Sequence, residues 1–154
     1  MTTIELPDWC CNDVEYQDFD FSRFACLQSL VIGENSFGSV KRFRLEGMPE
    51  LRSLKIGSES FTGLKKQCWQ DNIDFSQSKS FDALKSFYIL NCDLLESIEI
   101  GIFCFCDFAG EFALRNLPSL QSIKFGDMHN PSFNFCGASC VIQGINSFFL
   151  IIGC

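Results

Sequence analysis

One short pattern occurs four times in this sequence, and no other feature restricts the possible fold as strongly. The pattern is L-x-S-[LI]-x-[IF]-G, found at residues 27–33, 51–57, 95–101 and 120–126. Successive copies start 24, 44 and 25 residues apart. A single copy of this length cannot bury its apolar side, whereas stacked copies bury a continuous core. The pattern therefore predicts one domain built as a repeat array.

A second segment, in which apolar and polar residues alternate, precedes each copy. Because neighbouring side chains of an extended strand point to opposite faces, we expect both segments to form short strands with one apolar face. Stacking of the units pairs each strand with its equivalent in the next copy. We therefore predict a mostly β, right-handed parallel solenoid with two short strands per repeat. The second segments are Phe19-x-Phe21, Phe43-x-Leu45, Phe87-x-Ile89 and Phe112-x-Leu114.

The glycine that closes each copy marks the predicted end of a strand. Gly33, Gly57, Gly101 and Gly126 hold this position. A missing Cβ permits positive φ, so we expect these glycines to adopt that conformation where the chain turns.

Charged residues at the outward positions support the same register. When the copies are aligned without regard to charge, oppositely charged residues come to face each other on neighbouring strands. Such pairs contribute about 0.2–1 kcal/mol each, and like charges cost a similar amount. The facing pairs are Asp18 with Arg42, Asp20 with Arg44, Arg52 with Glu96, and Glu99 with both Lys55 and Lys124.

These repeats resemble the leucine-rich-repeat family. The L-x-x-L-x-[IL] core matches the strand motif of that family, with glycine in place of the usual Asn or Cys. With Phe37, Phe61 and Phe105 at a fixed offset after the glycine, the units are similar to irregular leucine-rich repeats of large protist proteins. The resemblance covers residues 18–127. It implies protein recognition through a strand-lined face, no catalysis and no cofactor.

The repeat pattern also divides the chain. Residues 1–17 are expected to be an N-terminal cap or a degenerate repeat, and residues 18–127 the leucine-rich-repeat solenoid. The 44-residue spacing indicates an insertion at about residues 62–80. Residues 128–154 are expected to be a degenerate C-terminal repeat. Its apolar stretch at 148–152 does not look like a polar cap, and an open strand edge predicts end-to-end self-association or a truncated fragment.

Composition limits the class of partner and the compartment. The formal net charge is −7 with a pI near 4.6, which argues against nucleic-acid binding because that requires a basic face. No apolar run reaches the length of about 18 residues that spans a membrane, so we expect no membrane insertion. Residues 1–10 do not resemble a signal peptide. The ten cysteines are then expected to be reduced core residues, which favours a cytoplasmic location.

Residues capable of catalysis or metal binding are few. His129 is the only histidine and is followed by Asn-Pro, which indicates a loop. The pairs Cys104-x-Cys106 and Cys136-x3-Cys140 fit the spacing of zinc sites only loosely. Cys104 aligns with the repeat positions Ser36 and Ser60. We therefore expect no catalytic residues, no metal and no cofactor.

The predicted outward face of one ladder carries a column of serines. These hydroxyls either bond across the strands as part of the structure or form a polar strip that contacts a partner. The corresponding hypotheses are a protein–protein recognition scaffold and a structural spacer or fragment without binding activity. The candidate binding face comprises Ser29, Arg52, Ser53, Lys55, Glu96, Ser97, Glu99, Gln121, Ser122 and Lys124.

Overall fold

The computed structural model describes residues 2–63, 81–127, 129, 132, 134, 135 and 137–146, and the backbone of 150–152. All regular elements in these residues are β-strands, and none of the residues forms a helix long and apolar enough to cross a membrane. The strands are β1 (Thr3–Leu6), β2 (Asp18–Asp20), β3 (Ser29–Ile32), β4 (Arg42–Glu46), β5 (Ser53–Ile56), β6 (Ser86–Leu90), β7 (Ser97–Ile100), β8 (Glu111–Leu117), β9 (Ser122–Phe125), β10 (Ser139–Ile145) and β11 (Leu150–Ile152).

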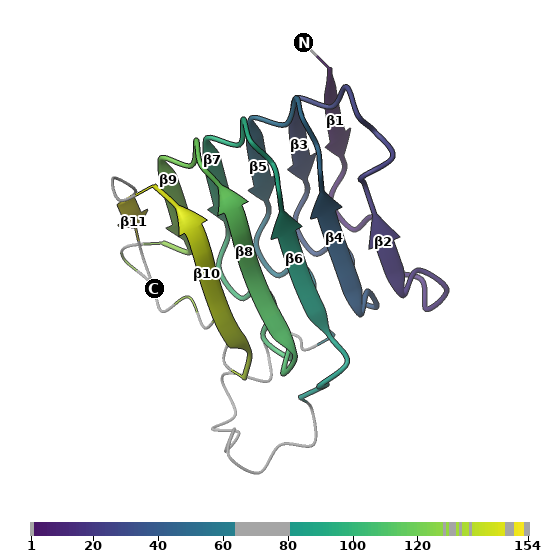
Figure 1. Ribbon diagram of the computed structural model, residues 1–154. Helices are drawn as coiled ribbons and strands as arrows, with labels where there is room; N and C mark the ends of the chain where they lie inside the picture. Colours follow the sequence, from purple (N-terminus) through teal and green to yellow (C-terminus); the bar gives the residue numbers. More distant parts are fainter. Residues whose placement is uncertain are drawn as a thin grey trace.

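The strands form two parallel sheets that face each other (Figure 1). Sheet A has the order β1-β3-β5-β7-β9-β11, and sheet B has the order β2-β4-β6-β8-β10. The chain alternates between the sheets, so each of about five turns adds one strand to each of them. The predicted parallel β-solenoid with two short strands per repeat is confirmed. Its right-handed sense stays a prediction.

The register is the one that the repeat predicts. In sheet A the four serines of the repeat lie opposite one another, and so do the apolar residues that follow them: Leu30, Leu54, Ile98 and Ile123. In sheet B, Phe19 lies opposite Phe43, which lies opposite Phe87. Because each strand pairs with its own equivalent, one set of alternating residues is directed inward along the whole array.

Two columns of phenylalanine rings fill the centre of the core. In the first column Phe61 stacks on Phe37 and Phe105, with ring centroids 5.0 and 4.8 Å apart. In the second, Phe43 stacks on Phe87 at 5.1 Å. The columns meet edge to face, for example Phe43 against Phe61 at 4.9 Å. These are the favourable geometries for aromatic pairs, each adding about 0.5–1.5 kcal/mol beyond its buried area.

The first column of rings comes from corners with an unusual backbone. Phe37, Phe61 and Phe105 have φ values of 57–60°, in the left-handed region, and each is completely buried. A residue two positions earlier, such as Asn35 or Glu59, also has positive φ. The chain reverses direction within a few residues by this means and directs the ring into the core.

Most of the closing glycines do not have the predicted conformation. Of the four, only Gly126 has positive φ (65°). At Gly33, Gly57 and Gly101, a Cβ would lie 2.4–2.6 Å from backbone nitrogen of the preceding turn. The expectation of positive φ was therefore wrong for these three positions. Glycine is required there because two turns of backbone approach each other too closely to leave room for a Cβ.

Candidate binding groove on sheet A

The outer face of sheet A carries the serine column. Within β5, Leu54 and Ile56 are buried, whereas Lys55 is exposed and Ser53 half-buried, so the serine and the lysine face outward. Ser53 lies between Ser29 and Ser97 in the register. Its hydroxyl group donates a hydrogen bond to the Oγ of Ser29 over 2.9 Å. The column is therefore partly bonded to itself and partly open to solvent.

The outward residues enclose a shallow groove of about 410 Å³. It runs across β3, β5, β7 and β9, between the serine column and a second outward column two residues further along each strand. The lining residues are Ser29, Val31, Ser53, Leu54, Lys55, Ser97, Ile98, Glu99, Ser122 and Lys124.

Charge along the second column alternates in sign. Lys55 and Glu99 are opposite in register, and Lys124 Nζ lies 3.2 Å from Glu99 Oε1. The Lys124 and Glu99 side chains are 48% and 43% exposed, so this pair contributes at most about 1 kcal/mol to stability. With hydroxyl groups on one side and both signs of charge on the other, the groove offers donors and acceptors at fixed positions without a strong net charge.

Seven of the ten predicted site residues line the groove, and three do not. Arg52, Glu96 and Gln121 each lie one position before a strand of sheet A, outside the groove. Arg52 Nη1 contacts Glu96 Oε1 over 3.0 Å, as the register predicted. Val31 was missed, although its alignment with Lys55 places it in the same column.

A second groove, of about 270 Å³, lies on the outer face of sheet B and includes Asp18, Arg42 and Tyr88. Asp18 pairs with Arg42 as predicted, and the hydrogen bond from that guanidinium lowers the pKa of the Asp18 carboxyl. Asp20 faces Arg44 in register, but Arg44 pairs with Glu46 on its own strand. Asp20 instead accepts a hydrogen bond from the backbone N–H of Ser22 over 2.9 Å. The charged residues therefore face each other in the predicted register, but not every facing pair forms an ion pair.

The cysteines do not gather into a metal centre in the described part of the chain. No group of three or more His, Cys, Asp or Glu residues close enough to hold a metal occurs there, and the described cysteines are free. Burial raises the pKa of the Cys104 thiol to about 12, so the free thiol is protonated at neutral pH. Cys136 and the insertion predicted at 62–80, apart from Thr62 and Gly63, lie outside the described residues. His129 is exposed.

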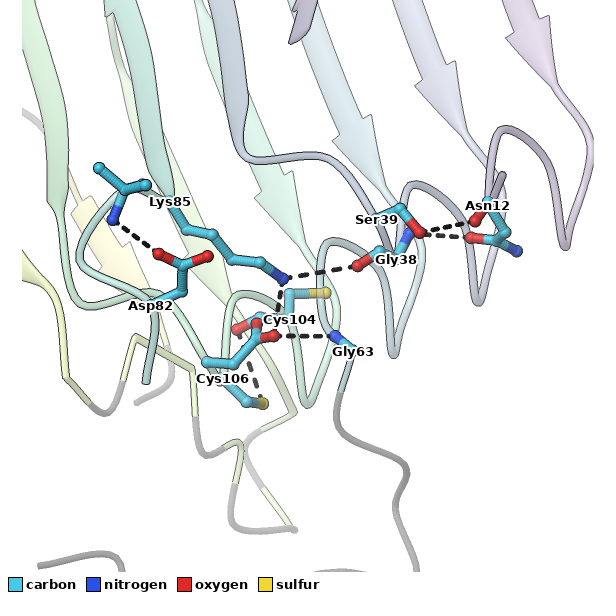
Figure 2. A network of polar contacts seen from close by, with 10 residues as sticks. Asn12, Gly38, Ser39, Gly63, Asp82, Lys85, Cys104 and Cys106 are labelled. Carbon is cyan, nitrogen blue, oxygen red and sulfur yellow. Dashed lines mark hydrogen bonds and ion pairs between the residues drawn. The ribbon is translucent and has the colours of Figure 1, made fainter. Parts of the chain in front are cut away.

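A buried ion pair was missed by the sequence analysis. Lys85 Nζ lies 2.6 Å from Asp107 Oδ2, and both side chains are 8% exposed. The same carboxylate oxygen accepts the backbone N–H of Gly63 over 3.0 Å, and Lys85 also approaches the carbonyl of Gly38 (Figure 2). Asp82 donates its backbone N–H to the Asp107 carbonyl. This network connects Gly63 to the segment that contains Asp82 and Lys85.

The fold and the groove define a repeat protein of the parallel β-solenoid class. No protein-family model, curated protein or solved structure matches the chain.

Proposed function

We propose that this chain is a leucine-rich-repeat scaffold that recognises another protein through the groove on sheet A. The observation that supports it most is the convergence of the repeat's outward positions on one groove, including Ser53, Ser97 and Glu99. Exposed residues on a rigid array of strands are held in fixed relative positions, which suits them to binding. The strand motif of the repeats supports the leucine-rich-repeat assignment.

The chemistry of the groove favours an exposed polypeptide segment as the ligand. Hydroxyl groups recur at the spacing of neighbouring strands, about 4.8 Å, and can exchange hydrogen bonds with peptide groups. The alternating charges of Lys55, Glu99 and Lys124 supply orientation rather than raw affinity. The net charge of −7 on the whole chain is compatible with a basic or neutral partner.

The test compares one substitution on each face. Ser97→Arg places a long side chain in the middle of the groove, whereas Tyr88→Arg places the same side chain on the outer face of sheet B. The purified wild-type protein is first used to capture partners from extracts of the cells that naturally produce it, and these partners are identified. Their affinity for wild type and for each purified variant is then measured by calorimetry. We expect Ser97→Arg to weaken binding by at least about tenfold and Tyr88→Arg to leave it unchanged.

The alternative function is a structural spacer, favoured by the hydrogen bond between Ser53 and Ser29. Under that hypothesis the hydroxyl column stabilises the sheet and has no ligand. Capture of no partner, or equal binding by wild type and Ser97→Arg, would support the spacer and contradict the groove.

Self-association is a second candidate interaction. In the described residues β1 and β2 each pair with one strand only, so their outer edges present unpaired backbone groups. We expect a second copy to add to such an edge. Sedimentation over a hundredfold range of concentration tests this, and a monomer throughout would contradict it.

A further inference from the structure

The thiol groups of two adjacent cysteines lie side by side in the corner between β1 and β2. Cys10 Sγ and Cys11 Sγ are 3.1 Å apart, and both residues are partly exposed. Neighbouring side chains of a strand would point to opposite faces. Here Cys11 has a φ of 56°, in the left-handed region, and both thiols fall on the same side of the chain. A disulfide bond of about 2.05 Å requires them to approach by roughly another 1 Å.

The repeat itself holds this arrangement. The backbone N–H of Cys10 donates to Ser36 Oγ over 3.1 Å, and the carbonyl of Cys10 accepts the N–H of Phe37 over 3.0 Å. Asn12 continues the attachment, since its carboxamide bonds to the N–H of Gly38 over 2.8 Å. The backbone around the two thiols is therefore fixed to the next corner.

The position of the pair in the repeat makes it accessible. Cys10 occupies the place of Ser36, and Cys11 the place of Phe37, whose left-handed conformation it shares. Phe37 and Ser36 are completely buried, whereas the two cysteines are not. Cys104 and Cys106, the other closely spaced cysteines of the described chain, are completely buried.

We propose that Cys10 and Cys11 form a redox-reactive dithiol site, which a small-molecule disulfide such as oxidised glutathione converts into a disulfide bond between these two residues. This inference is independent of the binding function proposed for sheet A.

The reaction proceeds by two exchanges. A thiolate attacks the small disulfide, forms a mixed disulfide and releases one small thiol. The second cysteine then loses its proton to solvent, and its sulfur displaces the second small thiol. The protein loses two protons and two electrons in total, and the small disulfide is reduced to two thiols.

The order of the two steps follows from burial. Desolvation, with the hydrogen bond to Cys10 as a further cause, raises the pKa of the Cys11 thiol to about 12. Cys11 therefore forms less thiolate at neutral pH than an ordinary thiol, so we expect the first attack to start from Cys10, with Cys11 as the resolving residue.

The bridge is expected to be easily reduced again. Adjacent Cα atoms are about 3.8 Å apart, below the usual range of about 4.4–6.8 Å for disulfides, so ring closure is strained. A strained, accessible disulfide is labile rather than a permanent cross-link. The site would therefore change state with the redox potential of its surroundings.

Peptide mass spectrometry of the full-length protein tests the proposal. Reduced protein is equilibrated in glutathione buffers of increasing oxidation, quenched in acid, alkylated and digested. We expect the peptide that contains Cys10 and Cys11 to become two hydrogens lighter and to resist alkylation, with reversal by dithiothreitol. Cys26 and Cys140, both exposed, serve as single-thiol controls in the same sample and should form mixed disulfides at most. Two alkylated thiols at Cys10 and Cys11 after the controls have reacted, or bridges to other cysteines, would overturn the proposal.

Two variants and one probe separate the steps. Cys11→Ser should accumulate the mixed disulfide at Cys10, whereas Cys10→Ser should react at least about tenfold more slowly than wild type. Reduced wild type should also bind phenylarsine oxide, a reagent that bridges two neighbouring thiols, and the oxidised form should not. The arsenical measurement does not depend on the folding of either variant. If phenylarsine oxide did not protect Cys10 and Cys11 from alkylation, the dithiol site would be contradicted.

Discussion

At the scale of single residues, the corners of the solenoid depend on one buried polar position. Ser36 and Ser60 are completely buried, and the N–H of Ser36 donates to Ser60 Oγ over 3.2 Å. Ser60 Oγ in turn donates to the carbonyl of Gly33 over 3.0 Å. In the next corner the Cys104 thiol donates to the carbonyl of Gly57 over 3.2 Å. A thiol thus replaces a hydroxyl group in the same column.

We expect Ser60→Ala to lower the free energy of unfolding by about 1–3 kcal/mol, because it leaves the buried N–H of Ser36 and the partly buried carbonyl of Gly33 without these partners. Cys104→Ser retains a donor at the matching position and should change stability by less than about 1 kcal/mol. Urea unfolding of both variants measures the difference. Equal losses in the two variants would show that the column is not held by these hydrogen bonds.

The same cysteine makes stability dependent on alkaline pH. Burial raises the pKa of the Cys104 thiol from the usual 9.0 to about 12. Between these values the unfolded chain has lost a proton that the folded chain keeps, so stability falls as pH rises, by up to about 1.4 kcal/mol per pH unit for one group. The free energies of unfolding of wild type and Cys104→Ser, measured from pH 8 to 11, should therefore diverge with this slope above about pH 9. Parallel pH profiles would contradict burial of a neutral thiol.

At the scale of the elements, glycines at the strand ends differ in what they contribute. A Cβ on Gly57 would lie 2.6 Å from the backbone nitrogen of Glu34, whereas a Cβ on Gly47 would meet nothing within 4 Å. Gly47 instead has a φ of 59°. The first position is restricted by packing between turns and the second by backbone conformation.

Gly57→Ala should therefore cost about 3 kcal/mol or more, at the upper end for overpacking, because two turns of backbone must separate. Gly47→Ala should cost only about 1–2 kcal/mol, the penalty of left-handed conformation for a residue with a Cβ. Thermal and urea unfolding of the two variants compare these costs. A larger loss for Gly47→Ala would contradict the role of close packing at Gly57.

Strands and register were predictable because both follow from local periodicity. The copies at 27–33 and 51–57 contain β3 and β5, and their serines pair as the alignment predicts. Contacts made outside the repeated strand positions were not predictable. Lys85 precedes β6 at the position that Lys41 holds before β4, but its ion pair with Asp107 and the attached hydrogen bonds depend on how neighbouring corners stack. The groove was largely predictable, since outward positions follow from the same period of two.

At the scale of the whole molecule, each strand forms its ladder of hydrogen bonds only with its neighbours in the stack. β5 pairs with β3 and β7, whereas β1 pairs with β3 alone. In such an array the stability is approximately a sum of repeat and nearest-neighbour contributions, so the ends open more readily than the centre.

Amide hydrogen exchange should therefore be slowest in β5 and β7 and fastest in the end strands, which are β1 and β2 at one end and β10 and β11 at the other. A difference of about 1.4 kcal/mol in opening free energy corresponds to about a tenfold difference in exchange rate. Exchange measured by mass spectrometry on the reduced, full-length protein resolves these segments, and rates for the unfolded chain provide the reference.

Ser97→Arg should leave the gradient intact, because its side chain faces outward, whereas Gly57→Ala should speed exchange in β3 and β5. Equal protection of β1 and β5 would mean that the stack opens as one cooperative unit, and contacts beyond nearest neighbours would then be needed to explain it.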